Sequence, residues 1–592
     1  MTAAASECIV VALDFGTSHS GVAIVHGTDA RSPEKIEIVK SWPESNGVTS
    51  DKVPTILDYE ADVEDPSWGY EVVPGVSNIS YIRLLLDDRQ EFPDWITKPD
   101  LVLRLHTAGK TTLQVITDYH SQLRDVATDE LNKRFSAGLL STNEIHWVLT
   151  VPAVWSDAAK QTTTDAAKAA GIDTNLHIIS EPEAAAIWSL ATMHSRDVQI
   201  GDVYIVCDAG GGTVDLITFQ VQSLDPIRFK EVVSGTGGLC GSAFINFGFE
   251  NLLKQKLGPH RFSEYRKRSP KMWKAAIDNF DQVIKPSFNP SKAKKRTRSF
   301  EIVMPGITDD KSVGIEDGVL TITSNEVEGL FAPVVKDVIR LIQKQKDAAV
   351  AAGTSPKDII LVGGLGQSAH LYNCIKLHFV DHIHTPSKKR SYSQMADRAS
   401  NLSAKGDLVL LKPTYAWTAI VRGAALSGVN GVDIVSSRKA RRHYGTVVNQ
   451  RFDASCHTED CRSWCLTEEE WKAGHQMSWF IRKGDETAAG VPILKDFYHT
   501  NSYDSKDIEI ELWSCDEDEA PQTKGPGVYR LCSFKVAPSI VPAKAFGSCQ
   551  TLTGKSYTKL RYKLGMHIGS GGLRFDFRVD DQVCGYVDAK FD

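Results

Sequence analysis

The chain has 592 residues, enough for several domains of ordinary size. Hydrophobic residues make up 42% and charged residues 24%, which excludes a disordered, collagenous or coiled-coil chain. The net charge of −7 argues against a general nucleic-acid-binding protein, whose phosphate contacts need a basic surface.

Targeting signals and cysteines set further limits. The longest apolar runs have the length of strands, and the N-terminus lacks a basic segment, so we expect neither a membrane span nor a secretory signal. The 11 cysteines are an odd number, and Cys8 and Cys207 lie inside apolar, strand-like runs. This usage favours a reducing compartment, the cytoplasm or the nucleus.

The first predicted elements form two similar strand–turn–strand passages. An apolar strand over 8–12 leads to Asp14 and a turn of Gly, Thr and Ser, after which the chain re-enters an apolar strand. A strand over 203–207 leads in the same way to Asp208, a Gly/Thr turn and another strand. Two distant copies of one pattern predict two related lobes.

Helices alternate with strands through the same region, which predicts an α/β architecture. The expected strands cover 145–151 and 359–362. The expected helices cover 157–170, 181–193, 327–352 and 368–379, the first with Ser156 as its N-cap. Beyond residue 431, short strands between Gly and Pro turns predict a β-rich module, for example at 508–513, 528–534 and 573–579.

Each hairpin turn carries the groups that a phosphate site needs. Turns of Gly, Thr and Ser present several backbone N–H groups at one point, and an Asp at the strand end can hold a hydrated Mg²⁺. Two such turns facing each other would clamp a nucleoside triphosphate. The sequence contains no Walker loop, and the Gly pair 363–364 lacks the GxGxxG spacing of a dinucleotide site.

Three segments together resemble the actin-like ATPase superfamily and, within it, the 70 kDa heat-shock protein family. They are VVALDFGTSHSGVAIV and VYIVCDAGGGTVDLITF for the phosphates and DIILVGGLGQSAHL for the adenosine. EPEAAAI and AIVRGAALSG resemble the connecting segments, so the likeness covers about residues 6–430. The following RKARRHYGTVVNQRF resembles the divergent, fungal-like heat-shock A12-type members, which lack the usual peptide-binding sandwich and lid.

The resemblance implies a two-lobed actin/heat-shock-type ATPase with ribonuclease H-like lobes, followed by the β-rich module. Lobe I would cover 1–199 and lobe II 200–430, with an outer subdomain at 251–325. The C-terminal module would cover 431–592.

The resemblance also implies roles for individual residues, with ATP or ADP and Mg²⁺ as ligands. Asp14 and Asp208 would flank the hydrated metal. The catalytic set would be Asp14, Glu181, Asp208, Thr213 and Arg83. The nucleotide-binding set would be Gly16, Thr17, Ser18, Gly210, Gly211, Gly212, Gly241, Lys285, Gly363 and Gly364.

Three positions depart from the family pattern. The family has a Lys in the first lobe that approaches the terminal phosphate, and no Lys stands at a matching place here. Arg83 is the nearest cation, although its planar fork replaces an ammonium only loosely. Gln367 stands in place of an Arg that stacks on adenine, and Trp417 in place of an Asp. We therefore expect slow hydrolysis.

The expected function is an ATP-binding heat-shock-70-like protein whose slow hydrolysis is coupled to lobe closure. It would regulate an unidentified protein partner or client, and neither nucleic acid nor a membrane would be a partner. One alternative is a nucleotide-dependent scaffold without turnover. Another is a metabolite kinase of the same superfamily, for which we identify no base-like Asp in the first lobe. Because no helical lid is expected, a specific folded partner is favoured over unfolded clients.

Two clusters in the C-terminal module allow more than one interpretation. Cys456, His457, Cys461 and Cys465 could bind Zn²⁺, although their spacing favours reduced structural thiols. The aromatic residues of the same region could mark a binding surface, but a buried core is the simpler prediction. These residues are Trp464, Trp471, Trp479 and Phe480.

Overall fold

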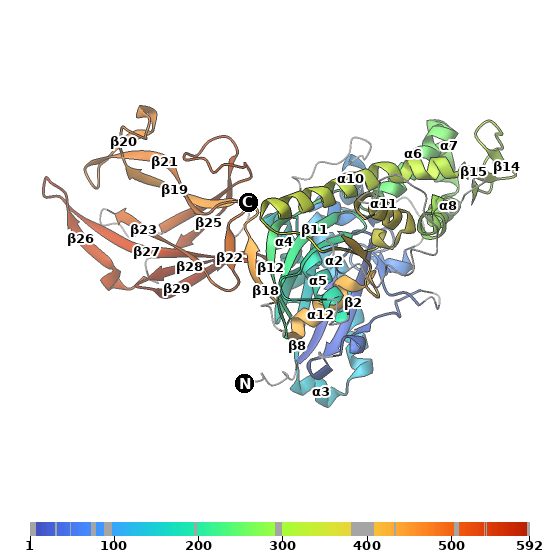
Figure 1. Ribbon diagram of the computed structural model, residues 1–592, viewed down its shortest axis with the longest axis horizontal. Helices are drawn as coiled ribbons and strands as arrows, with labels where there is room; N and C mark the ends of the chain where they lie inside the picture. The colour runs from blue at the N-terminus through green and yellow to red at the C-terminus, as the bar shows by residue number, and fades with distance from the viewer. Residues whose placement is uncertain are drawn as a thin grey trace, which may run out of the picture. The chain divides into compact units, whose positions relative to one another are not determined.

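The computed structural model divides the chain into two compact units (Figure 1). Unit 1 comprises Met1–Phe229 and Gly235–Ile434, and unit 2 comprises Lys230–Ser234 and Val435–Asp592. The residues that the structure describes are 8–29, 32–45, 47, 49–72, 78–87, 98–193, 198–225, 227–290, 299–380, 408–430, 434–501, 508–537, 539 and 541–588.

The first sheet of unit 1 has the strand order β3-β2-β1-β8-β9. Its centre is the predicted hairpin, in which β1 pairs antiparallel with β2, while β8 pairs parallel with β1 on the other side. Because helices cover the sheet, every residue of β1 is buried. The strands are β1 Cys8–Asp14, β2 His19–His26, β3 Glu37–Ile38, β8 Glu144–Val151 and β9 Leu176–Ser180, and β4 Val53–Pro54 also pairs with β2.

The second sheet of unit 1 repeats this plan in the order β17-β16-β10-β11-β12. β10 pairs antiparallel with β11 and parallel with β16, which matches the pairing of β1 with β2 and β8. The two related lobes predicted from the repeated pattern are therefore confirmed. The strands are β10 Val203–Ala209, β11 Val214–Leu224, β12 Ile227–Gly238, β16 Asp358–Val362 and β17 Val409–Leu411.

The predicted helices form, with small shifts at their ends. α4 (Asp157–Ala169) begins after Ser156, whose hydroxyl accepts the N–H of Ala159. α10 (Ser324–Ala351) begins three residues earlier than predicted, because Thr323 and Glu326 form a capping box.

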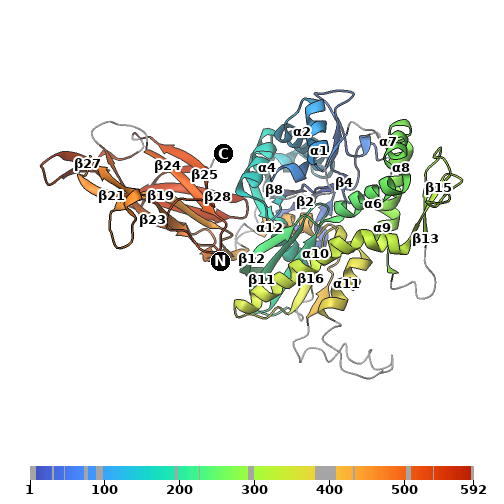
Figure 2. The ribbon, with the colours of Figure 1, turned by 90° about the horizontal axis from the view of Figure 1, so that it is seen from above.

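Helices also pack against both sheets. α10 packs on β10 and β11 (Figure 2), and α12 packs on α5 and on β1 of the first sheet. The remaining helices are α1 Lys98–Ala108, α2 Thr112–Arg134, α3 Ala137–Thr142, α5 Glu181–Thr192, α6 Ser242–Leu257, α7 Pro259–Arg268, α8 Pro270–Asn279, α9 Lys285–Ser287, α11 Ala369–Phe379 and α12 Ala419–Asn430. None of the helices in the described residues is long and apolar enough to cross a membrane.

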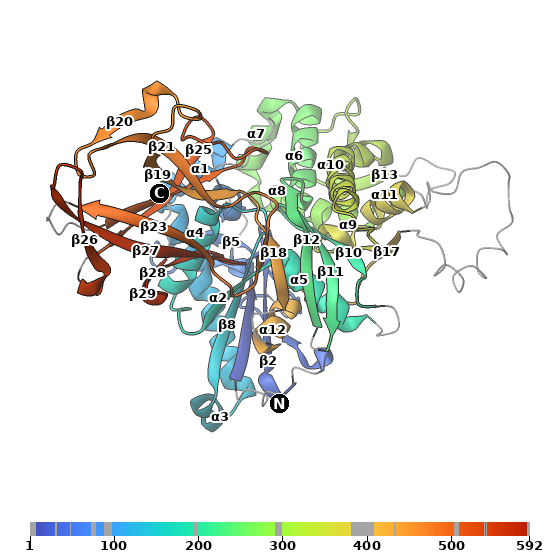
Figure 3. The ribbon, with the colours of Figure 1, turned by 60° about the vertical axis from the view of Figure 1, so that its left-hand side comes forward.

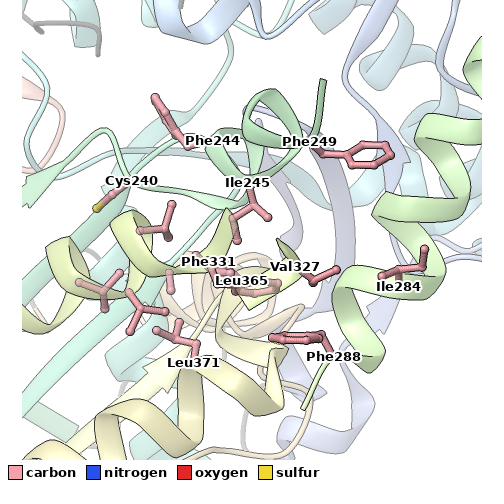
Figure 4. Packing of buried hydrophobic residues seen from close by; sticks show 14 of the residues in the cluster. Cys240, Phe244, Ile245, Phe249, Ile284, Phe288, Val327, Phe331, Leu365 and Leu371 are labelled. Atoms are coloured by element: carbon pink, nitrogen blue, oxygen red, sulfur yellow. The ribbon is translucent and has the colours of Figure 1, made fainter. Parts of the chain in front are cut away.

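An apolar cluster fixes the part of unit 1 that faces the predicted adenosine segment (Figure 4). Phe288, at the end of α9, stacks on Phe331 of α10 with ring centroids 5.3 Å apart. Leu365, next to the Gly pair 363–364, belongs to the same cluster. The cluster therefore holds Lys285 and the Gly pair on one rigid support.

Two small sheets complete unit 1. One has the order β13-β15-β14, and the other has the order β6-β5-β7. Their strands are β5 Ile56–Asp58, β6 Ser67–Trp68, β7 Ile79–Ser80, β13 Ser299–Val303, β14 Ile315–Glu316 and β15 Val319–Thr323.

Unit 2 is a two-layer β structure (Figure 3), as the strand pattern predicts. One sheet has the order β20-β21-β19-β24-β25 and the other β23-β27-β28-β29, with β26 paired to β27. Side chains of both sheets fill one apolar core. The strands are β18 Val435–Lys439, β19 His443–Arg451, β20 Arg462–Cys465, β21 Glu470–Ile481, β22 Glu486–Ala488, β23 Ile493–Asn501, β24 Ile508–Cys515, β25 Val528–Val536, β26 Phe546–Gln550, β27 Ser556–Gly569, β28 Gly572–Val579 and β29 Gln582–Asp588.

The aromatic residues of unit 2 divide between core and surface. Phe480 is buried in the core, as predicted. For Trp464 and Trp471 the core prediction is wrong, because they are 46% and 45% exposed and their rings contact each other edge to face on the β20–β21 hairpin. The turn before Glu470 brings both rings to the solvent face of the hairpin.

Candidate functional site

A cavity of about 1230 Å³ opens in unit 1, and both predicted phosphate turns line it. Most of the residues predicted for the site are in its wall. They are Asp14, Gly16, Thr17, Ser18, Arg83, Glu181, Asp208, Gly210, Gly211, Thr213, Lys285, Gly363 and Gly364. Gly212 and Gly241 do not belong to the wall; they lie behind it, in contact with the turns.

The two turns are in direct contact, which depends on glycine in the second turn. A β-carbon at Gly211 would lie 2.4 Å from Ser18 Oγ, and one at Gly212 would lie 2.6 Å from Thr17 Oγ1. Real side chains do not approach this closely, so only glycine allows the backbones to meet. The turns of the two lobes thus form one continuous polar surface of the cavity.

The N-terminus of α6 supports the second turn from behind. The N–H of Gly241 donates to the carbonyl of Gly212 (3.0 Å), and the N–H groups of Ser242 and Ala243 donate to Gly210 and Gly211 (3.1 and 2.8 Å). A β-carbon at Gly241 would lie 2.4 Å from the carbonyl oxygen of Gly211. Gly241 therefore fixes the shape of the turn.

Three buried carboxylates converge on the turns from the ends of regular elements. Asp14 ends β1, Asp208 lies near the end of β10, and Glu181 begins α5. Burial, together with the charges of Glu181, Asp215 and Asp14, holds the pKa of Asp208 well above its usual range. Burial also raises the pKa of Glu181 to about 7, against the opposing charge of Arg83.

Two buried cations face these carboxylates. Lys52 Nζ lies 2.6 Å from Asp14 Oδ2, and Arg83 Nη2 donates to Glu181 Oε1 at 2.5 Å. The guanidinium of Arg83 also lies 4.8 Å from the ring centroid of Trp155, a cation–π contact. Sequence reasoning did not single out Lys52, which also lines the cavity. The chain brings it there through the pairing of β4 with β2.

Aromatic and polar groups also line the cavity. The ring of Trp417 meets His19 edge to face (6.3 Å between centroids), and burial lowers the pKa of His19 to about 4. Lys285 donates to Asn246 Oδ1 (2.9 Å) and forms an ion pair with Asp281, while burial lowers the pKa of Lys285. The predicted contact of Lys285 with a base would thus compete with these two partners.

Comparison with known proteins agrees with this geometry. The model "Hsp70 protein" matches residues 121–385, and "Domain of unknown function (DUF8568)" matches residues 438–591. Human heat shock 70 kDa protein 12B is 25% identical over 89% of this chain and 83% of its own. Human heat shock 70 kDa protein 12A is 23% identical over 90% of this chain and 85% of its own length. The mouse protein 12A is also 23% identical, over 89% of this chain and 84% of its own length.

The chain is similar to the Hsp70 family and, over most of its length, to the A12-type heat shock proteins. Its two-lobed actin-like fold with a β-rich C-terminal unit and its likeness to the A12-type proteins are confirmed. This likeness to Hsp70 proteins supports nucleotide binding.

The carboxylates of this Hsp70-like site suit a hydrated divalent cation. Asp14, Glu181, Asp208 and Asp215 carry four formal negative charges, and Lys52 and Arg83 offset two of them. Asp208 Oδ1 is buried and has no hydrogen-bond partner among the described residues. Mg²⁺ prefers carboxylates and water, so the residues present fit it, with Asp208 as the better-placed holder because Asp14 is already paired.

The cysteine cluster of unit 2 does not form a metal site. In the part of the chain that the structure describes, no three His, Cys, Asp or Glu side chains are arranged to bind a metal directly. Cys456, Cys461 and Cys465 are free thiols at or near the surface.

Proposed function

We propose that this chain binds ATP and ADP in the cavity of unit 1, hydrolyses ATP slowly, and couples lobe closure to the regulation of a protein partner. The observation that carries the proposal is the direct contact of the two phosphate turns, one from each lobe, beside three buried carboxylates. A ligand held by both turns would link the two lobes, so binding favours their closed arrangement.

The residues of the site suit phosphoryl transfer to water, which needs positioning and charge neutralisation more than a strong base. The polar turns would bind the phosphates, and Thr213 places a hydroxyl in the same wall. With a pKa of about 7, Glu181 can accept a proton from water near neutral pH, and Arg83 orients it through Oε1. When bound, Mg²⁺ would offset phosphate charge, with Asp208 as its protein partner.

Slow turnover follows from the position of Arg83. Its guanidinium is bonded to Glu181 and lies against Trp155, so moving it towards a phosphate would break both contacts. The same observation supports the second candidate, a nucleotide-dependent scaffold without turnover. A single-turnover assay distinguishes the two, since only the ATPase releases phosphate from bound ATP.

Unit 2 is our candidate for the partner-binding part, because it exposes Trp464 and Trp471 next to each other. The 11 free cysteines agree with a reducing compartment such as the cytoplasm.

Calorimetric titration with ATP and ADP, with and without Mg²⁺, tests the binding. Absence of heat and of thermal stabilisation at millimolar ligand would overturn the proposal. For turnover the informative variant is Asp208→Asn, which removes a buried charge at the metal position with little change of shape. We expect it to lower phosphate release at least about tenfold while its melting temperature changes little. Asp125→Asn, on an exposed part of α2, is the matched control and should behave like the wild type.

A further inference from the structure

The cavity of unit 1 is larger than one nucleotide needs. Its volume is about 1230 Å³, whereas a pocket that encloses one drug-sized ligand measures about 300–1,000 Å³. The turns, Asp208 and the Gly pair 363–364 lie close together, since a β-carbon at Gly363 would come within 2.3 Å of Asp208 Oδ1. The nucleotide site proposed above therefore takes up one part of the wall.

One face of α6 carries the wall away from the phosphate turns. Ser242 lies at the second turn, and Asn246, Glu250 and Lys254 follow at intervals of four residues, all of them in the cavity wall. This spacing places them along one face of the helix. At 1.5 Å per residue, the step from Ser242 to Lys254 is about 18 Å. The cavity therefore extends well past the turns.

Two further helices complete this outer part of the cavity. α7 contributes Phe262 and Arg266, which are one helical turn apart, and α8 contributes Trp273. α7 contacts both α6 and α8 (Figure 2). The rings of Phe262 and Trp273 meet edge to face, with centroids 5.0 Å apart. The three helices thus form one connected wall.

An aromatic pair lies between the two ends of this wall. Phe247 is on the cavity-facing side of α6, between Ser242 and Lys254, and its ring centroid lies 5.1 Å from that of Tyr81, which follows β7. This contact narrows the cavity between the turns and its outer part. The outer chamber, as we call that part, is lined by Tyr81, Phe247, Lys254, Phe262, Arg266 and Trp273.

The charged residues of the outer chamber, Lys254 and Arg266, are both cations. Neither has an ion-pair partner in the part of the chain that the structure describes, although Arg266 is partly buried. The neighbouring charges in the cavity wall largely cancel. Glu250 and Arg104 both lie near Tyr81, and the two lysines of α8 and α9 each pair with an acid, Lys274 with Asp278 and Lys285 with Asp281. A cation without an acid in a concave wall attracts an anionic ligand.

A purely structural interpretation accounts for part of the outer chamber. Trp273 is buried in the apolar core, and Phe262 packs against that core. Core packing does not explain why the partly buried rings of Tyr81 and Phe247 share a cavity with Arg266. Apolar rings with a few convergent polar groups in a concave wall are typical of a small-molecule site.

We propose that the outer chamber binds a second small molecule, an anion with a flat apolar part, without displacing the nucleotide. Arg266 and Lys254 hold its acid group, and the aromatic rings contact its apolar part. The inference goes beyond the proposed function, because this wall lies past the phosphate turns and its residues are none of those assigned to the nucleotide.

The test uses anilinonaphthalene sulfonate, an aromatic anion that becomes fluorescent when it leaves water. Phenylnaphthylamine, which lacks the sulfonate, is the uncharged comparison. Both probes are titrated into the wild type and Arg266→Gln, with and without saturating ADP and Mg²⁺. We expect the variant to bind the sulfonate about tenfold more weakly, the loss of one charge-assisted contact, and to bind phenylnaphthylamine within about twofold of the wild type. Saturating ADP should change the affinity for the sulfonate less than about threefold.

Two further variants separate charge from fold. Arg268→Gln is the matched control, because Arg268 lies on the same helix, is 78% exposed and pairs with Glu264 outside the cavity wall. It should bind both probes like the wild type. Lys254→Gln, on an exposed position of α6, should weaken binding of the sulfonate about threefold. If Arg266→Gln does not fold, Lys254→Gln decides in its place.

The outcomes distinguish the two proposals. Absence of sulfonate binding by the wild type, or equal binding by Arg266→Gln and Arg268→Gln, would overturn the inference. Complete displacement of the sulfonate by ADP would overturn it as well, because the probe would then lie in the nucleotide site. Absence of ADP binding, together with sulfonate binding that depends on Arg266, would overturn the proposed function alone and support the outer chamber as a ligand site.

Discussion

Gly212→Ala tests the contact between the two phosphate turns directly. The new β-carbon would lie 2.6 and 2.7 Å from Oγ1 and Cγ2 of Thr17 and 2.9 Å from Cδ2 of Leu84. Thr17 is buried, and its β-carbon carries two heavy atoms, so rotation about χ1 exchanges one overlap for the other. The turns must therefore move apart.

The size of the effect follows from this overlap. Overpacking of a buried contact costs about 1–3 kcal/mol. Unit 1 has roughly 430 residues, and an unfolding entropy of about 2.1 cal/mol/K per residue converts each kcal/mol into roughly 1 °C of melting temperature. We expect unit 1 to melt about 1–3 °C lower. Since both turns would hold the phosphates, we also expect ATP to bind about tenfold more weakly.

Calorimetry of unfolding and of ATP binding measures both effects. Gly329→Ala is the matched control, because Gly329 lies in α10 and a β-carbon there meets nothing within 4 Å. It should stabilise the helix by about 0.5–1 kcal/mol. Thr17→Ser removes one of the overlapping atoms, so the double variant should recover at least about 0.5 kcal/mol. A Gly212→Ala protein with unchanged melting temperature and ATP affinity would show that the turns do not meet.

Two further predictions concern Trp417 and His120. Trp417→Ala should weaken the binding of ATP, ADP and AMP alike by about tenfold in calorimetric titrations, because a ring that lines the cavity can stack on the base. Trp417→Phe should retain most of the affinity. A loss of affinity confined to ATP would contradict this role. Burial lowers the pKa of His120 to about 3, so below its ordinary value of 6.5 the unfolded chain binds a proton that the folded chain excludes. Stability is therefore lost as the pH falls from 6.5 towards 3, by roughly 1 kcal/mol at pH 5.5. The melting temperature of His120→Leu should differ less between pH 7.5 and pH 5.5 than that of the wild type. An equal difference in melting temperature would refute the lowered pKa of His120.

Local signals made the helices and hairpins of unit 1 predictable. Ser156 accepts an N–H group at the start of α4, where the sequence predicts this cap, and α11 begins within one residue of its predicted start, after Ser368. The strands of the two hairpins are short apolar runs that end at an Asp, and the order of the segments matches the family. Backbone positions and turn residues were therefore available from sequence.

Contacts between residues far apart in the chain could not be predicted from the sequence. Lys52 and Asp14 meet because the two-residue strand β4 pairs with β2, and nothing in the apolar pattern predicts so short a strand. The exposure of Trp464 and Trp471 depends on which face of the β20–β21 hairpin meets solvent. A shift by one residue would reverse the faces, and the sequence does not set that register.

Unit 2 leads to a last prediction, that short apolar peptides bind this chain weakly and without a response to ATP. Phe497, Tyr562 and Phe577 stack in series in its core, with centroids 6.0 and 4.8 Å apart. An extended peptide would have to add to an edge strand such as β25, where it gains backbone hydrogen bonds on one side.

Among the described residues from 434 to 588 the structure has strands and short 3-10 turns but no α-helix that could cover such a peptide. A peptide held on one side dissociates fast, so binding should be weaker than micromolar. Fluorescence anisotropy with labelled apolar heptapeptides measures this, with a scrambled polar peptide as the control. Micromolar affinity that falls when ATP is added would contradict the prediction and indicate that the chain holds unfolded clients.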